Sequence, residues 1–521
     1  MVYKLAYAKL MFRTYIPNET VLFPECIGDF IPQDSPVRLI SDIVERMNLR
    51  ELIDSYGKSD EGNRPYNPVM LLKVTLYGYL CNIFSTRGLE EDIKRDLHMI
   101  WLSSRQFPDH STINRFKTRC LPYIKDLFGQ LVRILVEKGE ISLSKELYID
   151  GTTIRSRAAR RRIKWRSSAE RFSAMAGAEM QEALKDLLAQ VEEGVVNEAF
   201  RSACVERTPG DATLIAGQIE EAMGDSPKKG MKARIRRVRD AARRKQAHDG
   251  TLRGCRGRCG VAPTDPDCGI MHAKEDGYAG QPTPNYNVQI ATKNQYVTNY
   301  DVFDTPADNA TALDFIETCV EENGVKPEAV VEDAGYGCEE VYVGLEEMQV
   351  EAVVKYQGYD RQRRRPQTAG GSYHRDRFRL SRDGHGLICP ADRELRIVKV
   401  DTSVSRRGFK SDVTRFACDH CQGCRFYERC DLANARDKTI SRKMGSLREE
   451  AKAGERLDRP LNQQRLKRRS LEPEPVFGQL KHNHGYTRFR HFSKPKVMMD
   501  LGFELMALNL LKLHRNMKKL G

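Results

Sequence analysis

Apolar residues at three- and four-residue spacing dominate the first part of the chain. The stretch from Pro36 to Gly57 carries one amphipathic stripe, formed by Val37, Ile40, Ile43, Val44 and Met47. This is the pattern of a helix with one buried face. Residues 68–83 are apolar nearly throughout and predict a buried helix, and residues 87–104 predict a third helix. We therefore expect an N-terminal all-α domain over residues 1–140.

From residue 146 the pattern changes to that of β-strands. Residues 146–150 (ELYID) predict a short strand. Two alternating runs, 286–291 and 296–302, are joined by residues 292–295 and predict a β-hairpin. The sequence then predicts an amphipathic helix, a buried strand, a second helix and a last strand, at residues 307–323, 329–331, 338–348 and 351–356.

The order of these elements predicts the fold class. Three antiparallel strands followed by alternating helix and strand is the order of an RNase H-like sheet. By fold analogy we predict an α/β core with a mixed five-stranded sheet and flanking helices. This core would span residues 141–360, with a charged helical insertion at about 157–250, and helices in residues 441–521 would complete it. In such a sheet the first and fourth strands lie side by side.

These two strands each end in an aspartate with glycine close behind. Asp150 directly precedes Gly151, and Asp333 precedes Gly335 and Gly337, which are expected to turn the backbone tightly. Carboxylates at the C-terminal ends of central strands are where open α/β sheets place their chemistry. The simpler interpretation is that each aspartate caps the following turn.

A third carboxylate comes from the C-terminal helices, where Glu472 and Glu474 stand among basic residues that include Arg468, Arg469 and Arg488. Such residues, Arg488 among them, are expected to contact the DNA backbone without reading sequence. Glu474 and Lys481 are seven residues apart, which places them on one face of a regular helix. Two aspartates and a glutamate form an all-oxygen ligand set suited to Mg²⁺ (or Mn²⁺). Two such ions activate an attacking oxygen and stabilise the leaving oxygen of a phosphodiester. The alternative is that all three acids are ordinary caps or surface groups.

The charge of the chain points to a polyanionic partner. The 521 residues carry a formal net charge of +14, which favours nucleic acid, although a basic protein without such a partner has the same composition. In residues 108–120 a turn precedes a helix that Ser111 is expected to cap and that Arg115, Lys117 and Arg119 line. This pattern is typical of a DNA-binding module and equally of a helical bundle with solvated charges. The basic run at 228–247 either lies along phosphates or is a solvated or partly disordered insertion.

Cysteines concentrate in residues 361–440, which we expect to form a Cys-rich insertion. Cys418, Cys421, Cys424 and Cys430 have spacings of three, three and six, and Cys389 and His420 are further candidates. Thiolates at Cys-x2-Cys spacing can wrap one tetrahedral Zn²⁺ ion, so the pattern predicts a structural zinc site. Reduced thiols or a redox-sensitive patch would give the same pattern.

No run of eighteen or more apolar residues occurs, and the first twenty residues do not have the pattern of a signal peptide. We therefore expect no membrane partner, a cytoplasmic location, and cysteines that are thiols or metal ligands.

Six blocks of the sequence resemble the DDE transposases of bacterial insertion sequences, in the branch with an N-terminal helical domain and a Cys-rich insertion before the glutamate. The blocks follow in family order: PDHSTINRF at 108–116, YIDGTTIRS at 148–156, NYNVQI at 285–290, VVEDAGYG at 330–337, the cysteine cluster, and EPVFGQLK at 474–481. Together they cover most of the chain.

The resemblance implies a role for each acid. Asp150 and Asp333 would be the first and second catalytic aspartates, and Glu474, which directly precedes Pro-Val-Phe-Gly, would be the catalytic glutamate. Lys481 falls where related transposases carry an assisting lysine. The family's arginine and tyrosine positions hold Ser470 and Lys467 here, so Arg469 is the expected substitute.

The leading hypothesis is thus a transposase that binds the terminal inverted repeats of its element, cuts the DNA there and joins the freed 3′-hydroxyl to target DNA. We expect it to act as a homo-oligomer on DNA. One alternative is a non-catalytic, zinc-stabilised DNA-binding or regulatory protein derived from a transposase. Another is a structure-specific nuclease on the same fold.

Overall fold

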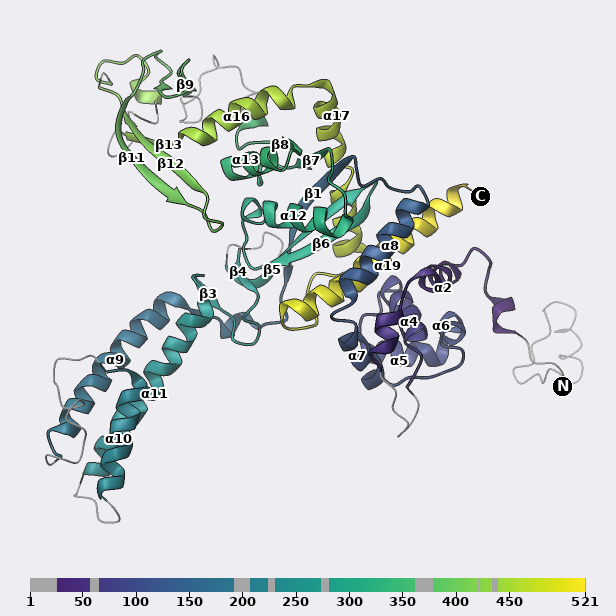
Figure 1. The fold of residues 1–521 in the computed structure, drawn as a ribbon, viewed down its shortest axis with the longest axis horizontal. Helices are drawn as coiled ribbons and strands as arrows, with labels where there is room; N and C mark the ends of the chain where they lie inside the picture. Colours follow the sequence, from purple (N-terminus) through teal and green to yellow (C-terminus); the bar gives the residue numbers. More distant parts are fainter. Residues whose placement is uncertain are drawn as a thin grey trace, which may run out of the picture. The chain divides into compact units, whose positions relative to one another are not determined.

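The computed structural model describes residues 26–56, 65–191, 207–223, 230–272, 281–360, 378–419, 421–430, 432 and 439–520, drawn as a ribbon in Figure 1. The chain divides into two compact units, one of residues 1–116 with 513–521 and one of residues 117–512. Each unit is described by itself. The second unit begins well before residue 140, because α8 (Ile124–Glu137) packs on the sheet through Phe128, which meets Tyr300 edge to face.

The first unit is helical, as the apolar pattern predicts. Its helices are α2 (Pro36–Arg46), α3 (Arg50–Asp54), α4 (Pro68–Leu80), α5 (Thr86–Arg95), α6 (Leu97–Leu102) and most of α7 (His110–Arg119). The predicted stripe on α2 is buried, and α4 is buried along most of its length. The single helix predicted over 87–104 is wrong, because Asp96 ends α5 and its side chain caps α6 by accepting the Met99 amide.

Helix α7 begins at His110, whereas the sequence pattern predicts a start near Thr112. Its first turn is capped by Asp109, whose Oδ1 accepts the Thr112 amide at 2.7 Å. The prediction that Ser111 caps this helix is therefore wrong, because Ser111 already lies inside the first turn. An aspartate in the capping position binds the free amides as well as a serine does.

The second unit is built on a mixed six-stranded sheet. Its strands are β1 (Glu146–Arg155), β4 (Gly269–Met271), β5 (Thr283–Lys293), β6 (Tyr296–Phe303), β7 (Ala329–Glu332) and β8 (Glu351–Val354). The order is β4-β5-β1-β7-β8, and β6 also pairs with β5. The predicted number of five is too low by one, because β5 is long enough to pair with β6 over residues 287–293 and with β4 over residues 283–285.

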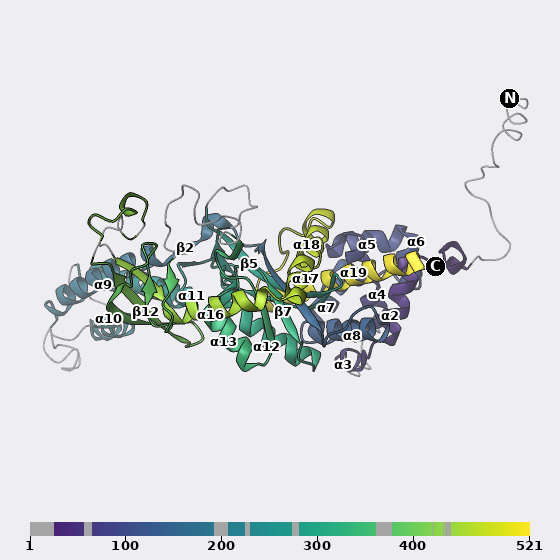
Figure 2. The same ribbon diagram turned by 90° about the horizontal axis from the view of Figure 1, so that it is seen from above.

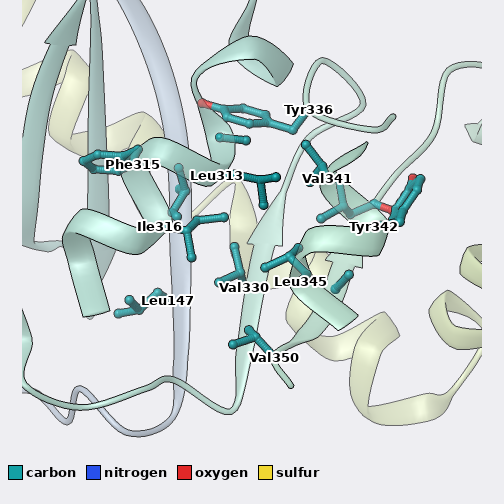
Figure 3. Close-up of a cluster of buried hydrophobic side chains, with 14 of the residues drawn as sticks. Leu147, Leu313, Phe315, Ile316, Val330, Tyr336, Val341, Tyr342, Leu345 and Val350 are labelled. Carbon is teal, nitrogen blue, oxygen red and sulfur yellow. The ribbon is translucent and has the colours of Figure 1, made fainter. Parts of the chain in front are cut away.

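Helices cover both faces of this sheet. On one face lie α12 (Ala312–Asn323) and α13 (Glu339–Glu347), and on the other lie α17 (Pro460–Arg469) and α18 (Pro473–Gly478) (Figure 2). Alternate strand residues divide between the faces. Leu147 and Val330 point into the core under α12 and α13 (Figure 3), whereas Tyr148 and Val331 join a second cluster with Leu457 on the opposite face.

Strand β1 is twice as long as the predicted strand of residues 146–150. It pairs antiparallel with β5 from Tyr148↔Thr292 to Arg155↔Asn285, so Asp150 lies within the strand and not at its end. Its parallel pairing with β7 covers only Glu146, Leu147 and Tyr148. Asp150 therefore still lies just beyond the point where the two central strands part.

The predicted hairpin is confirmed. Strands β5 and β6 are joined at Asn294 and Gln295, both with positive φ (51° and 61°). Such a two-residue turn matches the twist of the two strands.

The insertion predicted at 157–250 is helical in its described residues. Helices α9 (Arg166–Leu188), α10 (Pro209–Met223) and α11 (Met231–Cys255) pack around a small core of their own that includes Leu184, Ile215 and Val238. Many of the charges pair between helices, as Arg244 does with Glu179 and Arg239 with Glu220. The short strands β2 (Lys164–Trp165) and β3 (Gly260–Val261) pair at the base of the insertion.

The Cys-rich segment forms small sheets. Strands β9 (Arg379–Leu380) and β10 (Leu387–Ile388) pair, and β11 (Arg396–Val404), β12 (Lys410–Ala417) and β13 (Thr439–Lys443) form an antiparallel sheet. Residues 361–377 and His420, both included in the sequence predictions, lie outside the described residues.

The C-terminal part is helical, as predicted. Helix α16 (Met444–Leu457) is followed by α17, α18, a π-helical turn at Gln479–Asn483 and α19 (Lys494–Leu520). Within the described part of the chain, no helix is long and apolar enough to cross a membrane.

Candidate active site

The strand register places Asp150 next to Asp333. Tyr148 pairs with Val331 in the parallel ladder between β1 and β7, and each aspartate lies two residues further along its own strand direction. Because side chains alternate between the faces of a strand, two residues on means the same face. Both carboxylates therefore point to the face that α17 and α18 cover.

Arg469, the last residue of α17, brings the three predicted acids together. Its Nη2 lies 3.1 Å from Asp150 Oδ2 and 3.5 Å from Asp333 Oδ2. Its Nη1 lies 3.7 Å from Oε1 of Glu474, which is in the first turn of α18. One guanidinium thus contacts a carboxylate from each of three separate elements. A cation at this position also faces the negative C-terminal end of its own helix.

The two aspartates differ in their surroundings. The Asp150 side chain is 14% exposed and that of Asp333 is 43% exposed. Burial raises the pKa of Asp150 to about 6, against the opposing effect of the Arg469 charge and of the Gly151 amide that Asp150 accepts. Asp333 Oδ1 accepts the Gly335 amide at 2.7 Å, so this aspartate caps its turn and also turns Oδ2 toward Arg469.

Glu332 points to the opposite face of β7 and is fully buried. Burial raises its carboxyl pKa well above the usual value, and neither carboxyl oxygen has a hydrogen-bond partner among the described residues. Because it lies on the other face of the strand, Glu332 is not a ligand for a cation on the Asp333 side.

Sequence reasoning missed Asp308, which lies against the far face of the sheet beneath Gly151. Its Oδ1 accepts hydrogen bonds from Asn287 (2.8 Å) and Gln289 (2.9 Å). Tyr336 in turn donates its hydroxyl proton to Gln289. The signal was present in NYNVQI, where polar residues alternate with apolar ones along a strand that should otherwise be buried on both faces.

Gly151 and Gly335 are needed for close approach. A Cβ on Gly151 would lie 2.4 Å from Gln289 Nε2 and 2.6 Å from Asp308 Oδ1. A Cβ on Gly335 would lie 2.9 Å from Asp333 Oδ1. Both glycines therefore leave room for polar groups around the aspartates. The sequence predicted Gly335 for its ability to turn the backbone, and the structure adds this close packing as a second need for glycine.

The structure separates Glu472 from Glu474. Glu472 is buried, and its Oε2 accepts the Gln295 amide at 2.8 Å in the hairpin turn. Glu474 is more than half exposed and faces Arg469. The geometry thus favours Glu474, which the family pattern also favours.

Lys481 and Glu474, which are predicted to share a face, differ in exposure. Lys481 is only 9% exposed, whereas the Glu474 side chain is 56% exposed. Helix α18 ends at Gly478, and the chain continues as a π-helical turn. A wider turn changes the angular position of the later residues, so the seven-residue rule for a regular helix does not apply in its simple form.

Of the four predicted DNA contacts, Lys117 is not on the surface. Its ammonium lies 3.3 Å from Asp500 Oδ1, and the two side chains are 2% and 0% exposed. Burial lowers the pKa of Lys117, and the Asp500 charge opposes that effect. A lysine held in this way is part of the core. The prediction that Lys117 contacts DNA is therefore wrong. Arg115, Arg119 and Arg488 are exposed.

The predicted zinc ligands gather in one place. Cys418, Cys421, Cys424 and Cys430 line a small cavity together with Cys389. Burial first, and then the neighbouring Cys418 thiol, raise the pKa of Cys421 to about 12. However, among the side chains that the structure describes, no group of three or more His, Cys, Asp or Glu has the spacing of a metal site, and this holds for Asp150, Asp333 and Glu474 as well as for the cysteines.

The carboxylate site fits a divalent cation in its chemistry. Asp150, Asp333 and Glu474 offer hard oxygen donors, which Mg²⁺ and Mn²⁺ prefer. The three already turn toward a single cationic group, Arg469. A metal held by these oxygens would take the position of that group.

Two segments of the chain match families of transposases. Residues 25–119 match the family described as "Transposase domain (DUF772)", and residues 388–514 match the family described as "Transposase DDE domain". Comparisons with curated proteins and with solved structures gave no match. The two family matches confirm the resemblance to DDE transposases of insertion sequences.

The matches cover only part of the site. Glu474, Arg469 and the cysteines lie within the second matched segment, and helix α7 lies within the first. Asp150 and Asp333 lie outside both segments, so their place in the site depends on the strand register and on their contacts with Arg469.

Proposed function

We propose that this protein is a DNA transposase with an RNase H-like core, which binds the ends of its insertion sequence and carries out metal-dependent DNA cleavage and strand transfer. The observation that carries the proposal is the convergence of Asp150, Asp333 and Glu474 on one guanidinium. The two transposase family matches support the same function. The sheet order, with β1 between β5 and β7, supports the RNase H-like assignment.

The three carboxylates would hold Mg²⁺ or Mn²⁺. When bound, such ions supply charge for the attacking and leaving oxygens of a phosphodiester. The residues of the chain position the ligands: β1 and β7 hold the two aspartates in register, and α17 and α18 bring Arg469 and Glu474 over them. Buried Lys481 would support this helix pair from within, a change from the direct role that the family pattern implies.

Exposed arginines supply the proposed DNA contacts. Arg115 and Arg119 lie on the outer side of α7, and Arg488 is exposed near β1, where its guanidinium donates to the carbonyl oxygens of Ser156 and Arg157. Contacts of this kind hold the DNA backbone without reading its sequence. A homo-oligomer on DNA remains part of the proposal.

A structural zinc ion held by Cys418, Cys421, Cys424 and Cys430 is a second proposal. The shared cavity of these cysteines supports it. Metal analysis of protein purified without chelator tests it directly: the proposal expects about one zinc ion per chain. Less than about half an ion per chain contradicts it.

The main proposal is tested by incubating the protein with Mg²⁺ or Mn²⁺ and DNA that carries the ends of its element. The parent protein should nick this DNA and join it to a target duplex. Asp333→Asn should lower the rates of both reactions by more than about a hundredfold. The reason is that even a substitution of a residue that only hydrogen-bonds to a metal ligand typically costs about 10–100-fold. The matched control is Glu472→Gln, a nearby glutamate that the structure places away from the site and that should leave the reaction rate within about threefold.

Each alternative gives a different result. A nuclease on the same fold would nick the DNA but form no joined product. A regulatory DNA-binding protein would retain the DNA, show no metal-dependent cleavage, and be indifferent to a change at Asp150. Equal cutting by the parent and by Asp333→Asn would contradict the proposed site.

A further inference from the structure

Arg469 has an unusual set of contacts for a helix-terminal arginine. Its side chain is only 17% exposed, and its Nη atoms reach Asp150 Oδ2, Asp333 Oδ2 and Glu474 Oε1. These oxygens are the ones that the proposed metal would need. A guanidinium and a metal ion cannot bind the same three oxygens at once, because Mg²⁺ binds carboxylate oxygens at about 2.1 Å.

The guanidinium is held mainly by charge. Its contact with Asp150 at 3.1 Å is a hydrogen bond, whereas the contacts with Asp333 and Glu474 are longer, at 3.5 and 3.7 Å. Its Nε is buried and has no hydrogen-bond partner among the described residues. A cation with one unmatched donor is held less firmly than one in a complete hydrogen-bond network.

The helix that carries Arg469 is anchored independently of the site. Arg465, which is 8% exposed, lies 2.7 Å from Glu351 Oε2, and Arg468 pairs with Glu472 and Glu146. Both anchoring residues are on α17, one and four positions before Arg469. The Arg469 side chain can therefore leave the carboxylates without movement of the helix.

We propose that Arg469 is an internal cation that holds the three carboxylates together in the metal-free protein and competes with the divalent metal for them. This inference rests on the proposed function, because it takes these carboxylates as the metal ligands. Arg469 then has two effects. It provides a counter-charge for three converging carboxylates in the folded sheet. It also multiplies the apparent metal affinity by the fraction of time that it leaves the site free.

The test is an isothermal calorimetric titration of the full-length protein with Mn²⁺, without DNA. Arg469→Gln should bind Mn²⁺ about tenfold more tightly than the parent, the factor expected if the guanidinium leaves the site free about one tenth of the time. Arg468→Gln is the matched control, since it removes the neighbouring guanidinium, which contacts other acids, and it should leave Mn²⁺ affinity unchanged. Adding Asp333→Asn to either protein should abolish the binding.

A second measurement does not depend on metal affinity. Without metal, Arg469→Gln should unfold at a lower temperature than Arg468→Gln, because three carboxylates lose their shared counter-charge. Saturating Mn²⁺ should raise that temperature more in Arg469→Gln than in the parent. If Arg469→Gln does not fold, Arg469→Met, which keeps the length of the apolar stem, takes its place in both measurements.

The outcomes separate the two proposals. If Mn²⁺ binding requires Asp333 but is equal or weaker in Arg469→Gln, the internal-cation proposal is overturned and the proposed function stands. If Asp333→Asn leaves Mn²⁺ binding unchanged, or no protein binds Mn²⁺, the proposed metal site fails and this inference fails with it.

Discussion

The carboxylate site and the cysteine cluster were both predicted from sequence as metal sites, and the structure builds them in different ways. The three carboxylates are spread over more than three hundred positions of the sequence. Strand register brings the two aspartates together, and all three carboxylates contact one guanidinium. The cysteines are close in sequence and line one cavity. Among the described residues, neither set forms a group of three or more His, Cys, Asp or Glu with the spacing of a metal site. The two regions thus differ in how their side chains are brought together: by the fold of the sheet in one case, and by short sequence spacing in the other.

The two regions should also respond differently to substitution. The carboxylates lie on a sheet whose core is formed by other residues, so changes there should affect chemistry more than folding. Cys389 and Cys430 belong to the small core of their segment, together with Phe378, Leu387 and Phe416, and Cys418 packs against it. Changes there should affect stability more than chemistry.

The largest expected effect is that of Asp150→Asn. It should lower metal-dependent DNA cleavage by more than about a hundredfold, because it replaces a proposed metal ligand. The side chain keeps its shape, and burial already disfavours its charge, so the folded protein should be no less stable than the parent. Parallel cleavage assays and urea unfolding measure the two effects. Cleavage at the parent rate, or loss of cleavage because the variant is unfolded, would contradict the expected difference between the two regions.

Cys421→Ser should have the opposite profile. We expect its thermal unfolding midpoint to fall by about 5 °C, with any bound zinc lost, while the DNA cleavage rate of the folded protein stays within about threefold. Calorimetry with metal analysis measures this. EDTA treatment of the parent should reproduce the fall in midpoint and the loss of zinc, and cleavage is then compared after Mg²⁺ is added back in excess. An unchanged midpoint and metal content would show that the cluster is a set of free thiols.

Gly151→Ala tests how closely the groups around Asp150 are packed. An added Cβ would meet Gln289 and Asp308 at 2.4 and 2.6 Å, and overpacking of this kind costs about 1–3 kcal/mol of unfolding free energy. The control is Gly129→Ala in α8, where the nearest atom would be Arg133 Nη1 at 3.6 Å. That change should stabilise the protein by about 0.5–1 kcal/mol, as alanine does in a helix. Equal effects of the two changes in urea unfolding would contradict the packing described at Gly151.

The smallest expected effect is that of Gly423→Ala in the Cys-rich segment. Gly423 has φ +76° and open space around it, so the cost is backbone strain alone, about 1 kcal/mol. DNA cleavage should be unaffected. A loss of cleavage would mean that this segment acts on the site, which the comparison of the two regions does not allow.

Much of the sheet could be predicted from the sequence, since alternation and apolar runs located the hairpin and the strands at Val331 and Val353. Strand lengths could not, because β1 continues past Gly151 only through its pairing with β5. The pairing of Asp150 with Asp333 was predicted by fold analogy, and the parallel register between β1 and β7 places them together.

The failures have two physical causes. Lys117 looked like a surface cation because a sequence does not show that Asp500, nearly four hundred residues away, lies opposite. Asp308 was missed for a similar reason, because it lies in a short helical turn while its partners Asn287 and Gln289 lie on β5. The Lys481 prediction instead assumed regular helix geometry through a π-helical turn.

The central claim is that Asp150, Asp333 and Glu474 form one divalent cation site. The most direct measurement is Mn²⁺ affinity, by calorimetric titration, of Asp150→Asn, Asp333→Asn and Glu474→Gln beside the Glu472→Gln control. The account predicts that each of the first three weakens binding by about tenfold or more while the control does not. Parent-like Mn²⁺ binding by any of the three, in a folded protein, would contradict it.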